Sequence, residues 1–198
     1  MHYLLIIEGP DNIGKTTLAK AIQRILNIDD YDVQYKHFGA PVCTGEAAHR
    51  EELHKLEDEL KDLNTWSDKR YDRKTIKIFD RSAIDELVYG PIFRGCAIST
   101  TYKSRIEQLI NSKKWKTKII VFYANEQTYI KHNIKPKELE INAYQKRTLA
   151  QRISNKFIKI LKEYPPEKTL FVNCNKYESF EERNSYIMEQ VKKWFYEV

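Results

Sequence analysis

Eight residues near the start of the chain have the types and spacing that phosphate binding requires. Gly9 to Thr16, GPDNIGKT, fits the pattern G-x-x-x-x-G-K-[ST] in full. Glycines allow the backbone to curl so that successive N–H groups face phosphate oxygens. A helix beginning near Lys15 would direct the positive end of its dipole at the same anion. The pattern therefore predicts a loop that holds the phosphates of a nucleotide.

Two side chains of this loop have predicted chemical roles. Lys15 would bridge the β- and γ-phosphates of ATP, and the Thr16 hydroxyl would be a ligand of Mg²⁺. ATP and Mg²⁺ are thus the cofactors that the sequence indicates. The other loop residues predicted to bind ATP are Gly9, Asn12, Ile13, Gly14 and Thr17.

A carboxylate and an arginine follow a later apolar run, at Asp80-Arg81-Ser82. Asp80 stands at the carboxyl end of a predicted strand, which is the edge where ligands bind in an open α/β sheet. From there Asp80 would bind Mg²⁺ or its water ligands, and Arg81 would neutralise charge on a transferred group. An aspartate at a strand end can also simply cap the next helix. The sequence allows both interpretations.

The elements that must position these motifs alternate along the whole chain. Strands are predicted at residues 3–8, 33–38, 75–80, 118–123 and 169–173. Helices are predicted at 15–27, 46–63, 82–90, 100–113, a long stretch ending before Pro165, and a closing segment around Val191. Alternating strands and helices predict βαβ units and a parallel sheet covered on both faces, an α/β fold.

Composition limits the classes of protein that the chain can belong to. Its 198 residues suit a single domain, and 41% hydrophobic with 31% charged residues is typical of a globular chain. No apolar stretch is long enough to cross a bilayer, so no membrane partner is expected. Three widely spaced cysteines are typical of a reducing cytoplasm. The net charge of +6 is scattered among acidic residues, which favours a nucleotide partner over nucleic acid.

Together the two motifs resemble those of the thymidylate kinase family. Residues Glu8 to Thr17 followed by Asp80-Arg81 look like that family's pair, and the run from Asp80 to Gly95 resembles a stretch of its phage-type members. The resemblance implies a P-loop NTPase nucleotide-kinase fold, with a five-stranded parallel sheet and helices on both faces. It also implies ATP-dependent phosphoryl transfer to a deoxynucleoside monophosphate, dTMP-like first. A homodimer is compatible with it, as is a location in the host cytoplasm if a phage encodes the chain.

The same resemblance assigns roles to individual residues. The catalytic set would be Lys15, Asp11, Asp80 and Arg81, with Asp11 facing the acceptor's sugar or its attacking oxygen. Arg81 would bind the acceptor's phosphate or the transferred group. The other candidates for acceptor binding are Glu8, Phe38, Tyr89 and Arg94, near the aromatic residues Phe93 and Trp66. Each of these side chains could instead serve packing or the surface.

A lid over ATP is expected near residues 126–141, within the single domain 1–198. Its candidate cations are Lys135 and Lys137, with Arg147 on the helix that follows. A lid of this kind excludes the water that would otherwise hydrolyse ATP. A run of charges is also typical of plain solvated surface, so the residues themselves do not decide between the two.

Three departures from the thymidylate kinase pattern keep the acceptor open. Asn12 replaces a glycine, the segment 37–41 lacks an arginine, and Asp-Arg-Ser is closer to deoxynucleoside kinases. One alternative is therefore a deoxynucleoside kinase, or a kinase acting on a hydroxymethylated pyrimidine in DNA. The other is a P-loop ATP-binding or NTPase switch protein without a small acceptor, although the sequence has no clear N/T-K-x-D element for it.

Overall fold

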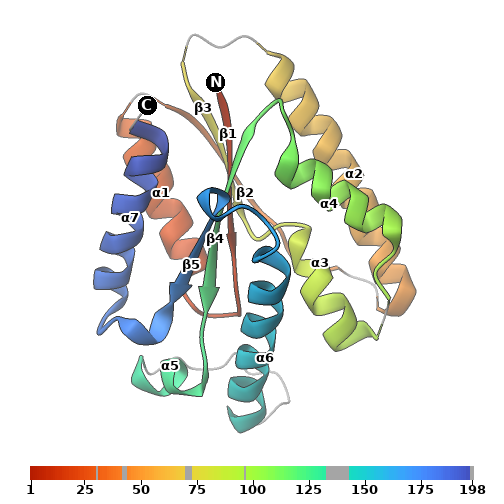
Figure 1. Cartoon of the computed structure of the whole chain (residues 1–198), viewed down its shortest axis with the longest axis vertical. Coiled ribbons are helices and arrows are strands. Elements are labelled where there is room, and N and C mark those ends of the chain that lie inside the picture. The colour runs from red at the N-terminus through yellow and green to blue at the C-terminus, as the bar shows by residue number, and fades with distance from the viewer. Residues whose placement is uncertain (30, 42–43, 70–72, 96, 133–142, 197–198) are drawn as a thin grey trace.

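The structure is a computed structural model, and it describes residues 1–198 except 30, 42–43, 70–72, 96, 133–142 and 197–198. A parallel sheet of five strands lies at its centre, in the order β2-β3-β1-β4-β5 (Figure 1). The strands are β1 His2–Glu8, β2 Asp32–His37, β3 Thr75–Asp80, β4 Lys116–Tyr123 and β5 Thr169–Asn173. The predicted α/β class and five-stranded parallel sheet are confirmed.

Helices cover both faces of this sheet (Figure 1). The α-helices of the described chain are α1 Lys15–Ile28, α2 Gly45–Asp68, α3 Ile84–Tyr89, α4 Thr100–Asn111, α5 Glu126–Lys131, α6 Ala143–Leu161 and α7 Phe180–Tyr196. Helices α1 and α7 pack on one face, while α2, α3, α4 and α6 pack mainly on the other. None of the described helices combines the length and the apolar run that a membrane crossing needs.

Strand β1 shows why the apolar run at the start of the chain forms the centre of the sheet. Successive side chains of a strand point to opposite faces. Leu4 and Ile6 accordingly join the core beneath α2, α4 and α6, whereas Leu5 and Ile7 join the core beneath α1 and α7. Because helices cover both faces, the strand is apolar from Tyr3 to Ile7 rather than alternating with polar residues.

The strand order brings the two sequence motifs to one edge of the sheet. Strand β1 pairs with β3, with Ile7 opposite Asp80, and β3 pairs with β2, with His37 opposite Asp80. The loop after β1 and the Asp80-Arg81 step after β3 therefore leave the sheet side by side. This carboxyl edge is where ligands bind in open α/β sheets.

The structure differs from the predicted elements in three places. The helix predicted over 82–90 does not end there: the chain continues past Tyr89 as a π-helical turn, Gly90–Arg94. A proline is tolerated in this turn because it fits the first turn of a helix. The short helix α5 lies in a stretch for which no helix was predicted. Trp66, expected near the acceptor, is 3% exposed in the core, and its ring packs on that of His2. The expectation for Trp66 was wrong because its helix extends to Asp68, toward the starts of β1 and β3.

Candidate active site

The loop after β1 has the curled backbone that the sequence predicts. Gly9, Asn12 and Gly14 have φ values of 136°, 60° and 88°. A Cβ at Gly9 would lie 2.7 Å from the carbonyl oxygen of Phe122, so this glycine lets the loop pack directly on β4. Asn12 adopts a left-handed conformation that asparagine tolerates better than most residues. Gly14 precedes the first residue of α1, so the amino end of that helix opens toward the loop.

Lys15 lies inside this loop. Its Nζ donates hydrogen bonds to the carbonyl oxygens of Gly9 at 2.8 Å and Pro10 at 2.6 Å. Burial, together with the nearby Arg81 cation, lowers the pKa of Lys15 to about 8. The ammonium group is therefore held where an anion bound by the loop would meet it.

Asp80 receives three hydrogen-bonding groups on one carboxylate oxygen. The Thr16 hydroxyl donates to Asp80 Oδ2 at 2.5 Å, the Tyr35 hydroxyl donates at 2.9 Å, and His37 Nδ1 lies at 2.9 Å. Burial alone would raise the pKa of Asp80, but these partners outweigh it and lower the pKa below its ordinary value. Asp80 is thus an ionised carboxylate in contact with the loop hydroxyl.

The pair Thr16 and Asp80 fits a magnesium ion. Hydroxyl and carboxylate oxygens are the ligands that Mg²⁺ takes in nucleotide sites, together with phosphate oxygens and water. Asp80 Oδ1 is buried and has no hydrogen-bond partner within the described chain. A buried carboxylate oxygen without a partner is costly, and a cation or its water ligands would satisfy it.

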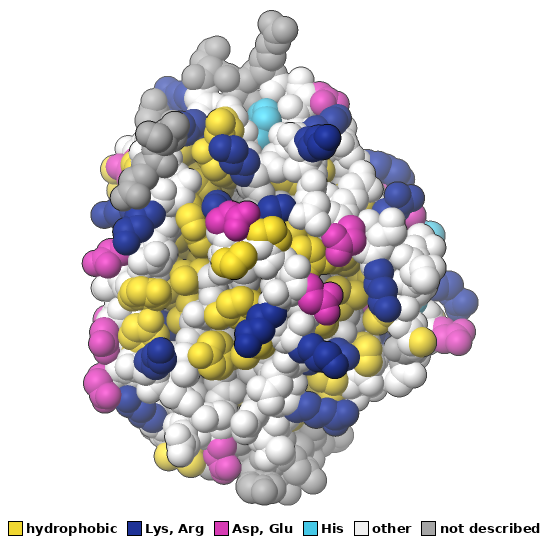
Figure 2. Space-filling model, in the orientation of Figure 1, with side chains coloured by type: hydrophobic (Ala, Val, Ile, Leu, Met, Phe, Trp, Pro, Cys, Tyr) yellow, Lys and Arg dark blue, Asp and Glu magenta, His cyan; other side chains and the backbone are white. Residues whose placement is uncertain are grey.

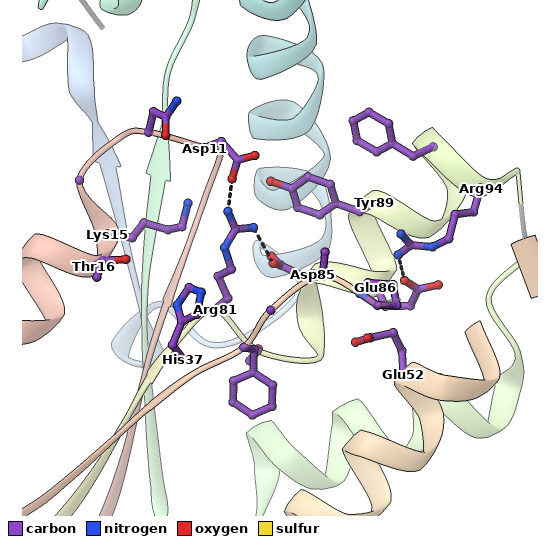
Figure 3. Close-up of a pocket in the computed structure, with 18 of the residues that line it drawn as sticks. Asp11, Lys15, Thr16, His37, Glu52, Arg81, Asp85, Glu86, Tyr89 and Arg94 are labelled. Atoms are coloured by element: carbon purple, nitrogen blue, oxygen red, sulfur yellow. Dashed lines mark hydrogen bonds and ion pairs between the residues drawn. The ribbon is translucent and has the colours of Figure 1, made fainter. Parts of the chain in front are cut away.

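Arg81 joins the loop, β3 and α3 through two ion pairs (Figure 3). Its guanidinium pairs with Asp11 in the loop and with Asp85 in α3, the latter at 3.1 Å. The backbone of Arg81 has φ of 71°, an uncommon value for a residue with a side chain. The turn after β3 therefore directs Arg81 back toward the phosphate-binding loop.

A cavity of about 720 Å³ opens over these residues. This volume lies within the range of small-molecule sites. At one end it is lined by loop residues, with Arg81 next to them. At the other end it is lined by side chains of α2, α3 and the π-helical turn, namely Glu52, Asp85, Glu86, Tyr89, Phe93 and Arg94.

The far end combines flat rings with paired charges (Figure 3). The rings of Tyr89 and Phe93 stack with centroids 5.6 Å apart and planes at 14°. Arg94 forms an ion pair with Glu86, and Glu52 on α2 lies below Glu86 in this view. Burial raises the pKa of Glu52. Aromatic faces beside hydrogen-bonding edges are suited to a flat polar ring such as a nucleobase.

Most of the sequence candidates meet at this cavity. Its lining includes Asp11, Asn12, Gly14, Lys15, Thr16, Thr17, Phe38, Arg81, Tyr89 and Arg94. The ring of Phe38 also packs on that of Phe79, with centroids 5.0 Å apart, so Phe38 contributes to both core and cavity. Gly9, Ile13 and Asp80 are not part of the lining. Gly9 packs on β4, Ile13 is buried in the core, and Asp80 is fully buried in contact with Thr16 and His37, which do line the cavity.

Glu8, predicted to bind the acceptor, lies outside the cavity. Its side chain is fully buried, does not line the cavity, and accepts a hydrogen bond from the Ser82 hydroxyl at 2.6 Å. Burial, with Asp85 nearby, raises the pKa of Glu8 well above its ordinary value. The expected contact between Glu8 and an acceptor is not supported, because Ser82 and Asp85 lie next to its carboxyl group.

The lid prediction falls mostly outside the described residues. Lys135 and Lys137 lie there, and of Arg147 only the helical backbone of α6 is described. The first part of the 126–141 segment is α5, and its Tyr129 hydroxyl donates to the carbonyl oxygen of Asp11 at 2.8 Å. This part packs on the phosphate-binding loop, and the lid itself stays a prediction.

Five polar residues of the cavity were not predicted as site residues from the sequence: His37, Glu52, Ser82, Asp85 and Glu86. Asp85 follows Arg81 by four residues, a spacing that could have indicated the ion pair. His37 ends a strand, but its contact with Asp80 depends on β2 lying next to β3. Glu52 and Glu86 look like ordinary polar positions of amphipathic helices.

No protein-family model matches the chain, and no curated protein sequence matches it. Solved structures do match, and they give the chain the fold of the P-loop nucleotide kinases.

Two of these structures illustrate the likeness. YorR from Bacillus subtilis, in complex with phosphorylated GDP, has a TM-score of 0.59 and 20% identity, over 96% of this chain and 96% of that one. Deoxyadenosine kinase from M. mycoides, with the products dCMP and dCDP bound, has a TM-score of 0.54 and 17% identity, over 96% of this chain and 99% of that one. The same kinase with dATP bound has a TM-score of 0.53.

Proposed function

We propose that this chain is a kinase that transfers the γ-phosphoryl group of ATP to a nucleoside-like acceptor. The observation that carries the proposal is one cavity with a phosphate-binding loop at one end and an aromatic, polar end opposite it. Arg81 lies between the two, which is where a transferred group would pass (Figure 3). A nucleotide switch without an acceptor would have no use for the second end.

Catalysis would come from positioning and neutralised charge rather than from a covalent intermediate. The loop amides and Lys15 would bind the phosphates of ATP. Thr16 and Asp80 would hold Mg²⁺, which would supply positive charge to offset that of the phosphates. Arg81 would turn from its carboxylate partners toward the transferred group, and Asp11 would then face the attacking oxygen of the acceptor.

The first candidate acceptor is a deoxynucleoside monophosphate, dTMP-like, as the resemblance to thymidylate kinases implies. Arg81 and Arg94 line the cavity and would supply cations for the acceptor's phosphate. The dCMP bound to the M. mycoides kinase also supports an acceptor or product of this size. In this case the stacked Tyr89 and Phe93 would lie beside the base.

A nucleoside is the second candidate, and the ion pairs favour it. Both arginines are engaged with carboxylates, Arg81 with Asp11 and Asp85, and Arg94 with Glu86. A dianionic phosphate would have to displace these carboxylates or lie beside them, which costs electrostatic energy. A neutral hydroxyl group meets no such cost. One of the similar solved structures is named a deoxyadenosine kinase, a kinase of a nucleoside, which agrees with this candidate.

Matched acceptor pairs that differ only in a 5′-phosphate test both candidates. We would measure ADP formation from ATP and Mg²⁺ with thymidine and dTMP, deoxycytidine and dCMP, and deoxyadenosine and dAMP. DNA containing hydroxymethyluracil would test the remaining acceptor class. Lys15→Ala is the control for every acceptor, because activity that survives it does not come from this loop.

Each result of this panel has a defined meaning. ADP formation that requires a monophosphate supports the first candidate, and formation that requires a nucleoside supports the second. Lys15-dependent ADP formation that no acceptor stimulates would contradict the kinase and leave the NTPase interpretation.

A further inference from the structure

A buried arginine lies behind the phosphate-binding loop, on an element that the mechanism above does not use. Arg183 stands in the first turn of α7, and it is only 1% exposed. Its Nη1 donates a hydrogen bond to the carbonyl oxygen of Ile13, in the loop, at 2.8 Å. The contact joins residues 170 positions apart in the chain.

The partners of Arg183 are polar or aromatic, and none is an anion. Its Nη2 donates to Asn184 Oδ1 at 3.0 Å, and Nη1 lies 3.8 Å from Cys174 Sγ. The guanidinium carbon lies over the rings of Phe122 and Phe180, 4.5 and 4.7 Å from their centroids. Within the described part of the chain no carboxylate forms an ion pair with it, and the Glu181 carboxylate acts on it only from beyond ion-pair distance.

Such an environment leaves a full positive charge incompletely compensated. Burying a cation is costly unless it is paired, and carbonyl, amide and ring partners compensate only in part. Arginines at buried positions usually meet a carboxylate or phosphate for this reason. The missing anion is therefore the feature of Arg183 that needs an explanation.

The loop brings that anion within reach. A Cβ at Gly14 would lie 3.0 Å from Arg183 Nη2, so the guanidinium touches the back of a glycine whose other side lines the cavity. Phe122, under the same guanidinium, also supports the other end of the loop at Gly9. Little more than the loop backbone separates Arg183 from the phosphate site, and charges interact strongly across a poorly hydrated layer.

We propose that Arg183 is a positioning residue for the phosphate-binding loop, and that its charge strengthens the binding of a nucleoside triphosphate. It would hold the Ile13 carbonyl from behind and supply a second, fixed cation besides Lys15. The inference rests on the proposed function only in taking a nucleoside polyphosphate as the ligand. It needs neither an identified acceptor nor a measured transfer rate.

Binding of ATP, ADP and AMP to the whole protein, measured by titration calorimetry, tests the proposal. Arg183→Met removes the charge and its hydrogen bonds while keeping an apolar stem. Arg183→Lys keeps a charge but cannot reach Ile13 and Asn184 together. Arg105→Met is the control, because Arg105 is an exposed arginine on α4 that pairs only loosely with Glu57 at 3.7 Å.

The expected losses depend on the number of phosphates. Arg183→Met should weaken the binding of ATP by at least about 10-fold, which corresponds to the loss of a charged hydrogen bond. The binding of ADP should weaken by less, and that of AMP by no more than about 2-fold. Arg183→Lys should recover part of the ATP affinity, and Arg105→Met should change none. If Arg183→Met does not fold, as shown by its circular dichroism, the graded loss must appear in Arg183→Lys.

Two results would overturn the inference. One is unchanged ATP affinity in the folded Arg183 variants; the other is an equal loss for ATP, ADP and AMP, which a purely structural defect would give. If the wild-type protein itself binds no triphosphate, the proposed function fails first, and the inference fails with it. The two failures are therefore distinguishable.

Discussion

The ammonium group of Lys15 lies where its charge is costly without an anion. Burial and the Arg81 cation lower its pKa to about 8, and within the described residues its hydrogen bonds go to two carbonyl oxygens, those of Gly9 and Pro10. Polyphosphate binding would supply the missing negative charge and raise the pKa again. Lys15 should therefore be protonated whenever ATP is bound, but only in part when the loop is free near pH 8.

This difference predicts a pH dependence of ATP binding. Above about pH 8 the free protein has lost the Lys15 proton, so binding must take up a proton and the apparent affinity should fall as pH rises. The fall approaches about 10-fold per pH unit well above the free pKa, for a single proton taken up. Titrations of ATP between pH 7 and 10 measure it, and Lys15→Met should abolish the slope. A slope that survives in Lys15→Met would assign the proton to another group.

Asp80 permits a second prediction about a single residue. Asp80→Asn keeps the shape of the side chain but removes the negative charge beside Thr16. We expect phosphoryl transfer to fall by at least about 100-fold and to need far more Mg²⁺, since Thr16, the protein ligand that remains, is neutral. Transfer rates measured over a range of Mg²⁺ concentrations give both quantities.

The control for Asp80 is Asp62→Asn, which removes an exposed carboxylate paired with Lys77. It should leave transfer and its Mg²⁺ dependence unchanged. Normal Mg²⁺ dependence in Asp80→Asn would mean that this carboxylate does not hold the ion.

Among the elements, the loop depends on how closely it packs on β4. Gly9 combines φ of 136° with a Cβ position 2.7 Å from the Phe122 carbonyl oxygen, so any side chain there meets both strain and a clash. The clashing atom belongs to the backbone of Phe122, which cannot move aside as the end of a flexible side chain could. Gly39, in contrast, has nothing within 4 Å of its Cβ position.

Alanine at these two glycines should therefore have very different effects. Gly9→Ala should lower the free energy of unfolding by at least about 2 kcal/mol, from backbone strain and overpacking together. Gly39→Ala should stay within about 0.5 kcal/mol of the wild type. Urea unfolding curves compare them. Equal stability of the two variants would contradict the packing of the loop on β4.

The sequence was sufficient for most elements because their signals are local. Apolar runs predicted the five strands to within about two residues, and the glycine spacing predicted the loop. Helix α5 was not predicted because six residues of mixed polarity carry almost no periodic signal. The contact of His37 with Asp80 and the burial of Arg183 were not predicted either. Both depend on the order in which strands and helices are packed, which no local pattern encodes.

At the scale of the whole molecule, charge is arranged differently on the surface and in the cavity. Lys and Arg side chains are interspersed with Asp and Glu over the face that Figure 2 displays, in keeping with the scattered net charge of +6. In the cavity, carboxylates pair with the cations instead of leaving them exposed. A homodimer, which the resemblance allowed, stays a prediction for a measurement of mass in solution.

We propose above all that the γ-phosphoryl group moves from ATP to an acceptor held in the same cavity. The most direct measurement follows γ-labelled ATP with Mg²⁺ and each acceptor of the matched panel, and separates labelled acceptor from labelled inorganic phosphate. We predict label on at least one nucleoside or nucleoside monophosphate, at a rate that Lys15→Ala lowers by at least about 100-fold. Label that appears only as inorganic phosphate, whatever acceptor is present, would contradict the proposed kinase.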